Sequence, residues 1–159
     1  MTELILACGL GIGIVAGLRS MTPPAILTWA AYFGWINVVP GPFWFIAWGP
    51  VVVLLTAWAI FELVIDKTAK IGNRTGIVGL LFRIVTSGFS AAVLSSTAGM
   101  GLAIGIISGL FGGVIGTFGG YYLRKKIVQD GSLGDLPVAV AEDVIAISLG
   151  VMCVYFARI

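Results

Sequence analysis

The stretch Gly101–Tyr122, GLAIGIISGLFGGVIGTFGGYY, decides the fold. It carries no charge and reaches the length of about 20 residues that a helix needs to cross a bilayer. Glycine recurs at every fourth position along two lines, Gly101, Gly105, Gly109 and Gly113, then Gly112, Gly116 and Gly120. Gly9, Gly13 and Gly17 repeat the spacing near the start. Because residues four apart share one face of a helix, these lines predict grooves without side chains along which other helices pack closely.

The whole chain has the composition of a membrane protein. Of its 159 residues, 59% are hydrophobic and only 10% are charged, with a mean hydropathy of +1.10, whereas soluble domains carry about 25% charged residues. We therefore predict a single transmembrane domain over residues 1–159, surrounded by the lipid bilayer. The absence of histidine excludes histidine-based metal sites, triads and proton relays. No cofactor and no nucleic-acid partner are expected.

Charges, prolines and turns divide the chain into six candidate membrane helices. The expected helices cover Glu3–Ser20, Pro23–Asn37, Phe43–Asp66, Gly76–Ser95, Gly99–Tyr122 and Pro137–Phe156. The second, with Thr22 as its expected N-cap, is short; if it is re-entrant, five spans remain and the charge pattern of the loops is broken. Gly49-Pro50 either kinks the third helix or ends a short interfacial piece before it. The prediction is an all-α, polytopic membrane protein of about six helices.

Lysine and arginine are concentrated on one predicted side of the membrane. With six spans, that side holds the turn at Arg19 and the loops Lys67–Thr75 and Arg124–Leu136, while the other side holds only Arg158. Because short basic loops stay in the cytoplasm, we predict that these loops are cytoplasmic and that both termini lie outside.

Several ionisable residues interrupt runs that otherwise suit lipid. A charge at the bilayer centre costs roughly 2.5–3.5 kcal/mol on insertion scales, so such residues face the protein interior and have a partner or a ligand. Counted in helical turns, these residues fall in the same cytoplasmic third of their helices. They predict a binding or transport site formed by Glu62, Asp66, Arg83, Glu142, Asp143 and Arg19.

Helical spacing assigns faces to these residues. Arg83 begins a polar stripe that Ser87 and Ser90 continue toward the centre of the membrane. Glu142 points about 100° away from Asp143 and so toward the headgroup boundary. Asp143 shares its face with small residues, which predicts close packing around it: Ala139, Ala146 and Gly150.

Acids outnumber bases in this cluster. Glu62, Glu142 and Asp143 against Arg19 and Arg83 leave one excess negative charge, which a buried site balances with a cation or with a proton on a carboxylate. The leading hypothesis is a small transporter or channel with an acidic, cytoplasm-facing site for a proton, small cation or small charged solute. Arg83 would tune the protonation of the acids or bind a counter-charge.

Two alternatives stay open. In the first, the charges only clamp helices together in a non-transporting assembly or scaffold protein. In the second, a carboxylate pair acts on a lipid, but no activated serine, cysteine or histidine accompanies it, so an enzyme is less favoured and no catalytic residue is assigned. A homodimer is expected, because five or six short helices enclose little volume and the extra glycine line offers a partner surface.

Several short elements, taken in order, resemble a known family. They are Ala16-Gly17-Leu18-Arg19, Glu62-x-x-x-Asp66-Lys67, Arg74-Thr75, Arg83 with the small residues after it, and Pro137 followed by Glu142-Asp143. Together they resemble the domain-of-unknown-function 4126 family of small bacterial membrane proteins. The resemblance implies a location in the bacterial inner membrane and implies no activity. In such proteins a proline usually follows the Glu-x-x-x-Asp-Lys element, whereas Thr68-Ala69 follows it here.

Overall fold

The computed structural model describes residues 2–68, 76–129, 131 and 134–158. Its elements are α1 (Thr2–Leu18), α2 (Thr22–Tyr32), the 3-10 helix η1 (Trp44–Ala47), α3 (Gly49–Thr68), α4 (Ile77–Thr97), α5 (Leu102–Gln129) and α6 (Asp135–Ala157). Among the described residues, four helices, α3 to α6, are long and apolar enough to cross a membrane, and α1 is a shorter apolar helix. The prediction of an all-α, multi-span membrane protein is confirmed.

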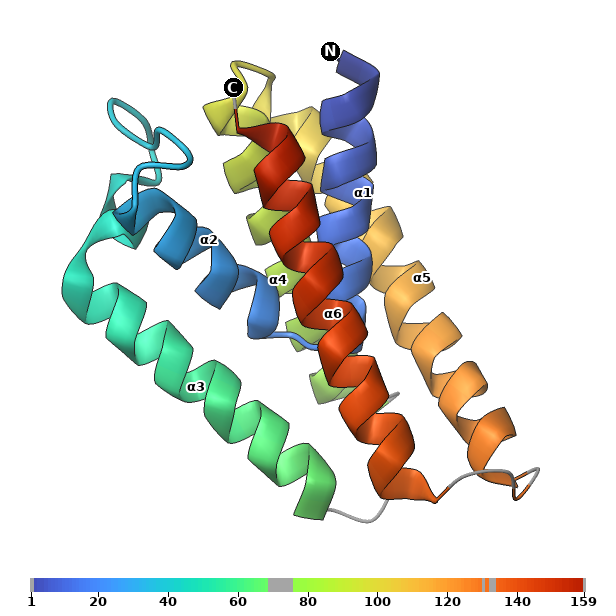
Figure 1. The fold of residues 1–159 in the computed structure, drawn as a ribbon. Helices are drawn as coiled ribbons and strands as arrows, with labels where there is room; N and C mark the ends of the chain where they lie inside the picture. The colour runs from blue at the N-terminus through green and yellow to red at the C-terminus, as the bar shows by residue number, and fades with distance from the viewer. Residues whose placement is uncertain (1, 69–75, 130, 132–133, 159) are drawn as a thin grey trace.

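The helices form a bundle with one helix set apart (Figure 1). Both chain ends lie at the upper end of the bundle in this view, whereas α3 and α5 finish and α6 begins at the lower end. The contacts of α1 are mainly with α4, α5 and α6, while α3 packs mainly against α2. The termini thus share one end, as predicted, and which side of the membrane that end faces stays a prediction.

The first two helices are both short. With 11 residues, α2 extends about 16 Å at the usual rise of 1.5 Å per residue, which is too little to cross a bilayer. In Figure 1, α1 descends from the upper end and α2 returns toward it. Because the chain leaves the upper end along α1 and returns toward it along α2, helices α3 to α6 alternate in direction as they would after two full spans. Whether this pair re-enters the bilayer, and so whether the charge pattern of the loops holds, stays a prediction.

Prolines explain why α1 and α2 are separate helices. Pro23 and Pro24 occupy the first turn of α2, where a proline is tolerated because its missing N–H would have no helical partner. The same residues would interrupt the hydrogen bonds of α1 if that helix continued. Met21 is the N-cap, without a side-chain capping bond, so the expectation that Thr22 fills this position is wrong.

Several other boundaries differ from the sequence-based expectation. The second helix ends at Tyr32 instead of Asn37. The 3-10 helix before Gly49 shows that a short separate piece precedes α3. Because α5 continues to Gln129 and α6 begins at Asp135, much of the expected loop Arg124–Leu136 is helical. Lys67 belongs to α3, and residues 69–75 of the other basic loop lie outside the described residues.

The two glycine lines of α5 pack against two different helices, as their spacing predicts. A Cβ atom on Gly109 would overlap the backbone of Ser87 in α4. A Cβ atom on Gly116 would overlap the carbonyl oxygen of Ile14 in α1. The backbones therefore touch, and the packing depends on the missing side chains.

The glycines of α1 complete the same interface. A Cβ atom on Gly13 or Gly17 would overlap the carbonyl oxygen of Gly109 or Gly113, respectively. In the second line of α5, Gly112 and Gly116 meet the carbonyl oxygens of Leu10 and Ile14, so this line is covered by α1 within one chain. This removes the argument that this line is a surface for a homodimer.

Candidate functional site

The break between α1 and α2 is the centre of a buried group of charges. Arg19 follows the last residue of α1, and its side chain is fully buried, with 0% exposure. Its Nε lies 2.6 Å from Oδ1 of Asp143, its Nη2 lies 3.9 Å from Oε2 of Glu142, and its Nη1 pairs with Oδ2 of Asp66. Carboxylates from α3 and α6 therefore surround one guanidinium group.

A second arginine extends these contacts to α5. Arg124 donates from Nε and Nη2 to the two oxygens of Asp135, at 2.8 and 2.9 Å. Its Nη1 lies 3.5 Å from Oε2 of Glu142 and 3.6 Å from Oδ2 of Asp66. The two arginines thus share two carboxylates.

Lys67 adds a further cation from α3. Its Nζ lies 2.8 Å from Oδ2 of Asp143. We name the connected set the Arg19 network; its described members are Arg19, Asp66, Lys67, Arg124, Asp135, Glu142 and Asp143.

The Arg19 network runs from the surface into the protein. Side-chain exposure falls from 37% at Asp135 to 22% at Asp66, 10% at Glu142, 8% at Asp143 and 0% at Arg19. The outer members are therefore accessible at the surface of the protein, whereas the inner members are shielded. Ion pairs gain strength in such surroundings, and any unpaired charge becomes costly.

Glu62 holds the start of α2. Its Oε1 accepts from the backbone N–H and the hydroxyl of Ser20 at 2.8 and 2.6 Å, and its Oε2 accepts from the N–H of Met21 at 2.7 Å. The positive end of the α2 dipole favours a carboxylate here. A side chain of α3 thus supplies the cap that the chain lacks locally.

Arg83 holds the end of α1. Its Nη1 donates to the carbonyl oxygens of Gly17 and Leu18, both at 2.7 Å. The last carbonyls of a helix have no partner within the helix and attract a cation. Glu62 and Arg83 therefore stabilise the two sides of the same break.

The polar stripe beyond Arg83 is buried, as its spacing predicts. Ser87 and Ser90 are both inaccessible to solvent. The hydroxyl of Ser87 donates to the carbonyl oxygen of Arg83 at 2.6 Å and lies 3.2 Å from that of Gly13. The hydroxyl of Ser90 has no hydrogen-bond partner among the described residues.

Comparison with known proteins places the chain in a family without an assigned activity. A family model described as "Domain of unknown function (DUF4126)" matches residues 6–157. The chain belongs to this family. No curated protein and no solved structure matches it. Any function for this DUF4126 protein must therefore be argued from its own geometry.

The structure brings most of the predicted site residues together. Arg19, Asp66, Glu142 and Asp143 belong to the Arg19 network, while Glu62 and Arg83 border the break beside it. Arg19 lies at the centre of the acids Asp66, Glu142 and Asp143, whereas we had expected Arg83 to tune their protonation or to bind a counter-charge. Glu142 does not extend toward the headgroups; it is mostly buried and lies between the two arginines.

Three members of the network were not among the predicted site residues. We had placed Lys67 and Arg124 in predicted cytoplasmic loops, and we had given Asp135 no role. A signal for Arg124 was present, because it follows Gly120 by four residues and so continues the glycine line that faces α1. Extending α5 by two turns would have placed this arginine inside the bundle.

The network pairs each of its described charges with an opposite charge. Its described members are four carboxylates and three cations, each within 4 Å of an opposite charge. Among the described residues, no group of three or more acidic or cysteine side chains has a geometry that could hold a metal. Protonation of any one carboxylate would redistribute the remaining ion pairs.

Proposed function

We propose that this protein is a small membrane transporter that lets protons cross the membrane, with or without an ion or small charged solute, and that carboxylates of the Arg19 network take up and release these protons. The observation that carries the proposal is the position of Arg19. It is fully buried at the break between two short helices and is contacted by Asp66, Glu142 and Asp143. Ionisable groups inside membrane proteins are costly and mark ion or proton pathways by default.

The reversal of the chain between α1 and α2 supports the same proposal. Secondary transporters commonly bind their substrates where a membrane helix is interrupted, because free backbone groups and helix dipoles meet there. Here Glu62 occupies the free N–H groups at the start of α2, and Arg83 occupies the free carbonyls at the end of α1. A charged solute that competes for either set of backbone groups would release the turn between the helices.

The graded exposure of the network gives protons a route from water. A proton arriving at the lower end first meets Asp135 and Asp66, and the inner acids Glu142 and Asp143 come next. Protonation of Asp143 would remove one counter-charge from both Arg19 and Lys67. The network would then hold the turn between α1 and α2 less firmly. Proton uptake would in this way be coupled to movement of that turn.

Proton flux tests the proposal directly. The protein is reconstituted into liposomes that contain a pH-sensitive dye, and a pH step is applied while potassium and valinomycin clamp the membrane voltage. We expect pH equilibration several-fold faster than in protein-free liposomes, and we expect Asp143→Asn to return the rate to the protein-free value. Glu3→Gln, which changes an exposed acid far from the network, should behave as wild type. Equal rates in wild type and Asp143→Asn would contradict the proposal.

One observation favours the second candidate, a scaffold whose charges clamp its helices. Only 11% of the apolar window of α3 is buried, yet its lower end supplies Glu62, Asp66 and Lys67 to contacts with the break and with α6. Under this alternative, Asp143→Asn lowers the melting temperature in detergent, and wild-type liposomes show no proton flux above the protein-free rate.

A further inference from the structure

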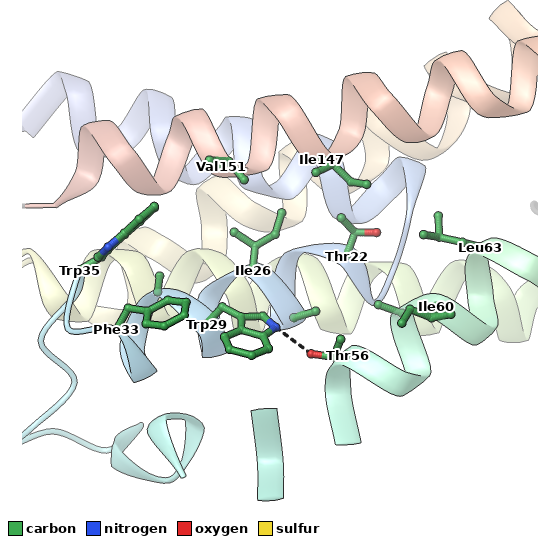
Figure 2. A pocket seen from close by; sticks show the side chains of 13 residues that line it. Thr22, Ile26, Trp29, Phe33, Trp35, Thr56, Ile60, Leu63, Ile147 and Val151 are labelled. Carbon is green, nitrogen blue, oxygen red and sulfur yellow. Dashed lines mark hydrogen bonds between the residues drawn. The ribbon is translucent and has the colours of Figure 1, made fainter. Parts of the chain in front are cut away.

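A groove lies between α2, α3 and α6, away from the charged network. Its volume is about 410 Å³, within the range of about 300–1,000 Å³ that is typical of ligand pockets. Figure 2 shows side chains from all three helices around it. The lining includes Trp29, Phe33, Trp35, Leu63, Ile147 and Val151.

The groove follows from the shortness of α2. In Figure 1, α3 and α6 approach each other at the lower end and diverge upward, with α2 between them. The hydrogen bond from Nε1 of Trp29 to Oγ1 of Thr56, at 2.9 Å, fastens α3 to α2. Glu62 fastens α3 to the start of α2 in the same way. Because α3 is fixed to α2 at both points, it does not close against α6.

We propose that this groove binds one acyl chain of a membrane lipid. None of the described residues that line it is ionisable. Both α3 and α6 have the length and hydropathy of membrane-spanning helices, so acyl chains surround the mouth of the groove. An apolar cavity that opens to lipid and stays empty would forfeit the dispersion contacts of its walls.

The lining also gives the lipid a direction. Figure 2 shows Trp35 and Phe33 at one end of the groove and Leu63 at the other. Tryptophan side chains prefer the headgroup level of a membrane. The headgroup therefore lies near Trp35, and the chain runs along α6, past Val151 and Ile147, toward Leu63.

The size of the groove argues against a helix of a second copy as the occupant. A helix has a diameter of about 10–12 Å with its side chains, so a volume of 410 Å³ holds only about one turn. An acyl chain is thinner and can follow the groove along its length. A lipid from the surrounding bilayer is the occupant that fits.

Brominated lipid tests the proposal, because bromine quenches tryptophan emission on contact. Two single-tryptophan proteins are made with the other four tryptophans replaced by phenylalanine, one keeping Trp29 and one keeping Trp58. Each is loaded with a phospholipid that carries a brominated acyl chain and is then washed with excess detergent. We expect Trp29, in the groove, to lose most of its emission and stay quenched, and Trp58, outside it, to recover.

A groove-filling variant supplies the matched control. Val151 lines the groove and is 39% exposed, so Val151→Phe extends into the groove with little cost to the fold. Val144→Phe adds the same bulk to an exposed position of α6 that is not in the groove lining. We expect Val151→Phe to restore the emission of Trp29 after washing and Val144→Phe to leave it quenched.

Native mass spectrometry provides a second readout. One phospholipid per chain should persist in wild type and in Val144→Phe and be lost in Val151→Phe. Equal recovery of Trp29 and Trp58 would mean that only loosely attached surrounding lipid is present, and it would overturn the proposal. A dimer that Val151→Phe dissociates would overturn it too, because a second copy would then cover the groove.

Discussion

Two regions of this protein are held together in opposite ways. In the glycine core, formed by α1, α4 and α5, backbones touch over long lines, and added Cβ atoms would overlap carbonyl oxygens. In the arm, formed by α2 and α3, a few hydrogen bonds at Trp29 and Glu62 hold the two helices together, and a groove separates much of α3 from α6. In lipid, where helices gain nothing from hiding apolar surface, close packing is the main source of stability.

The two regions differ in how easily they can move. The glycine core cannot change its spacing without losing contacts along a whole line. The arm can move by exchanging a small number of hydrogen bonds. The Arg19 network lies where the two regions meet, because Arg19 follows the end of α1 and pairs with Asp66 in α3.

The largest loss of stability is expected from a substitution at this junction. Arg19→Met leaves several buried carboxylates without their central cation and should lower the free energy of unfolding by about 3–5 kcal/mol, the usual cost of removing one partner of a buried ion pair. Thermal melting in detergent measures the change. If the ion pair with Asp143 is the cause, adding Asp143→Asn should cost less than the sum of the single effects. Strict additivity would contradict this account.

A smaller effect is expected inside the glycine core. Gly116→Ala places a methyl group against the carbonyl oxygen of Ile14 and should cost about 1–3 kcal/mol, as overpacking usually does. Gly119→Ala is the matched control, because a Cβ atom there meets nothing within 4 Å. The two positions are three residues apart in the same helix. Equal melting temperatures for the two would show that close backbone contact is not what stabilises the core.

Glu62→Gln should destabilise the arm and leave the stability of the glycine core unchanged. The amide keeps an acceptor but loses the charge that favours the start of α2, so we expect a loss of about 1–2 kcal/mol. Hydrogen exchange should rise in α2 and stay unchanged in α1 and α5. Glu3→Gln, an exposed acid in α1, is the control. Exchange that rises equally in all helices would mean that arm and core are one cooperative unit.

The smallest effect is expected at the contact between α2 and α3. Trp29→Phe removes the donor to Thr56, and because the site is exposed to its surroundings, the cost should be about 0.5–1 kcal/mol. Trp44→Phe changes a tryptophan of η1 for which no side-chain hydrogen bond is described, and serves as the control. A double electron–electron resonance distance between labels in α3 and α6 should broaden only in Trp29→Phe.

The sequence predicted the glycine core better than the arm. The length of the apolar runs located the helices. The glycine spacing identified two faces of α5, because the lack of a side chain permits close backbone contact at any position of a helix. The shared depth of the charges was also predictable from helical turns. It could not be predicted from depth alone that Asp143 pairs with Arg19, because Arg83 lies at a similar level and the choice depends on where α1 ends.

The arm depended on features without a clear sequence signal. The end of α2 at Tyr32 and the tilt of α3 set the groove, and both follow from contacts with residues far along the chain. Arg124 was missed because a run of basic residues suggests a loop, whereas tertiary contacts with Asp135 and Glu142 keep this segment helical. Helix ends are decided by such partners as much as by local propensity.

The position of Arg19 also has a consequence for biogenesis. When α1 and α2 first enter the bilayer, α3 and α6 have not been synthesised, and the buried guanidinium lacks both Asp66 and Asp143. An unpaired arginine at depth costs roughly 2.5–3.5 kcal/mol on insertion scales. We therefore expect Arg19 to stay close to the membrane surface until α3 and α6 supply its counter-charges, so that the bundle is completed when α6 joins it.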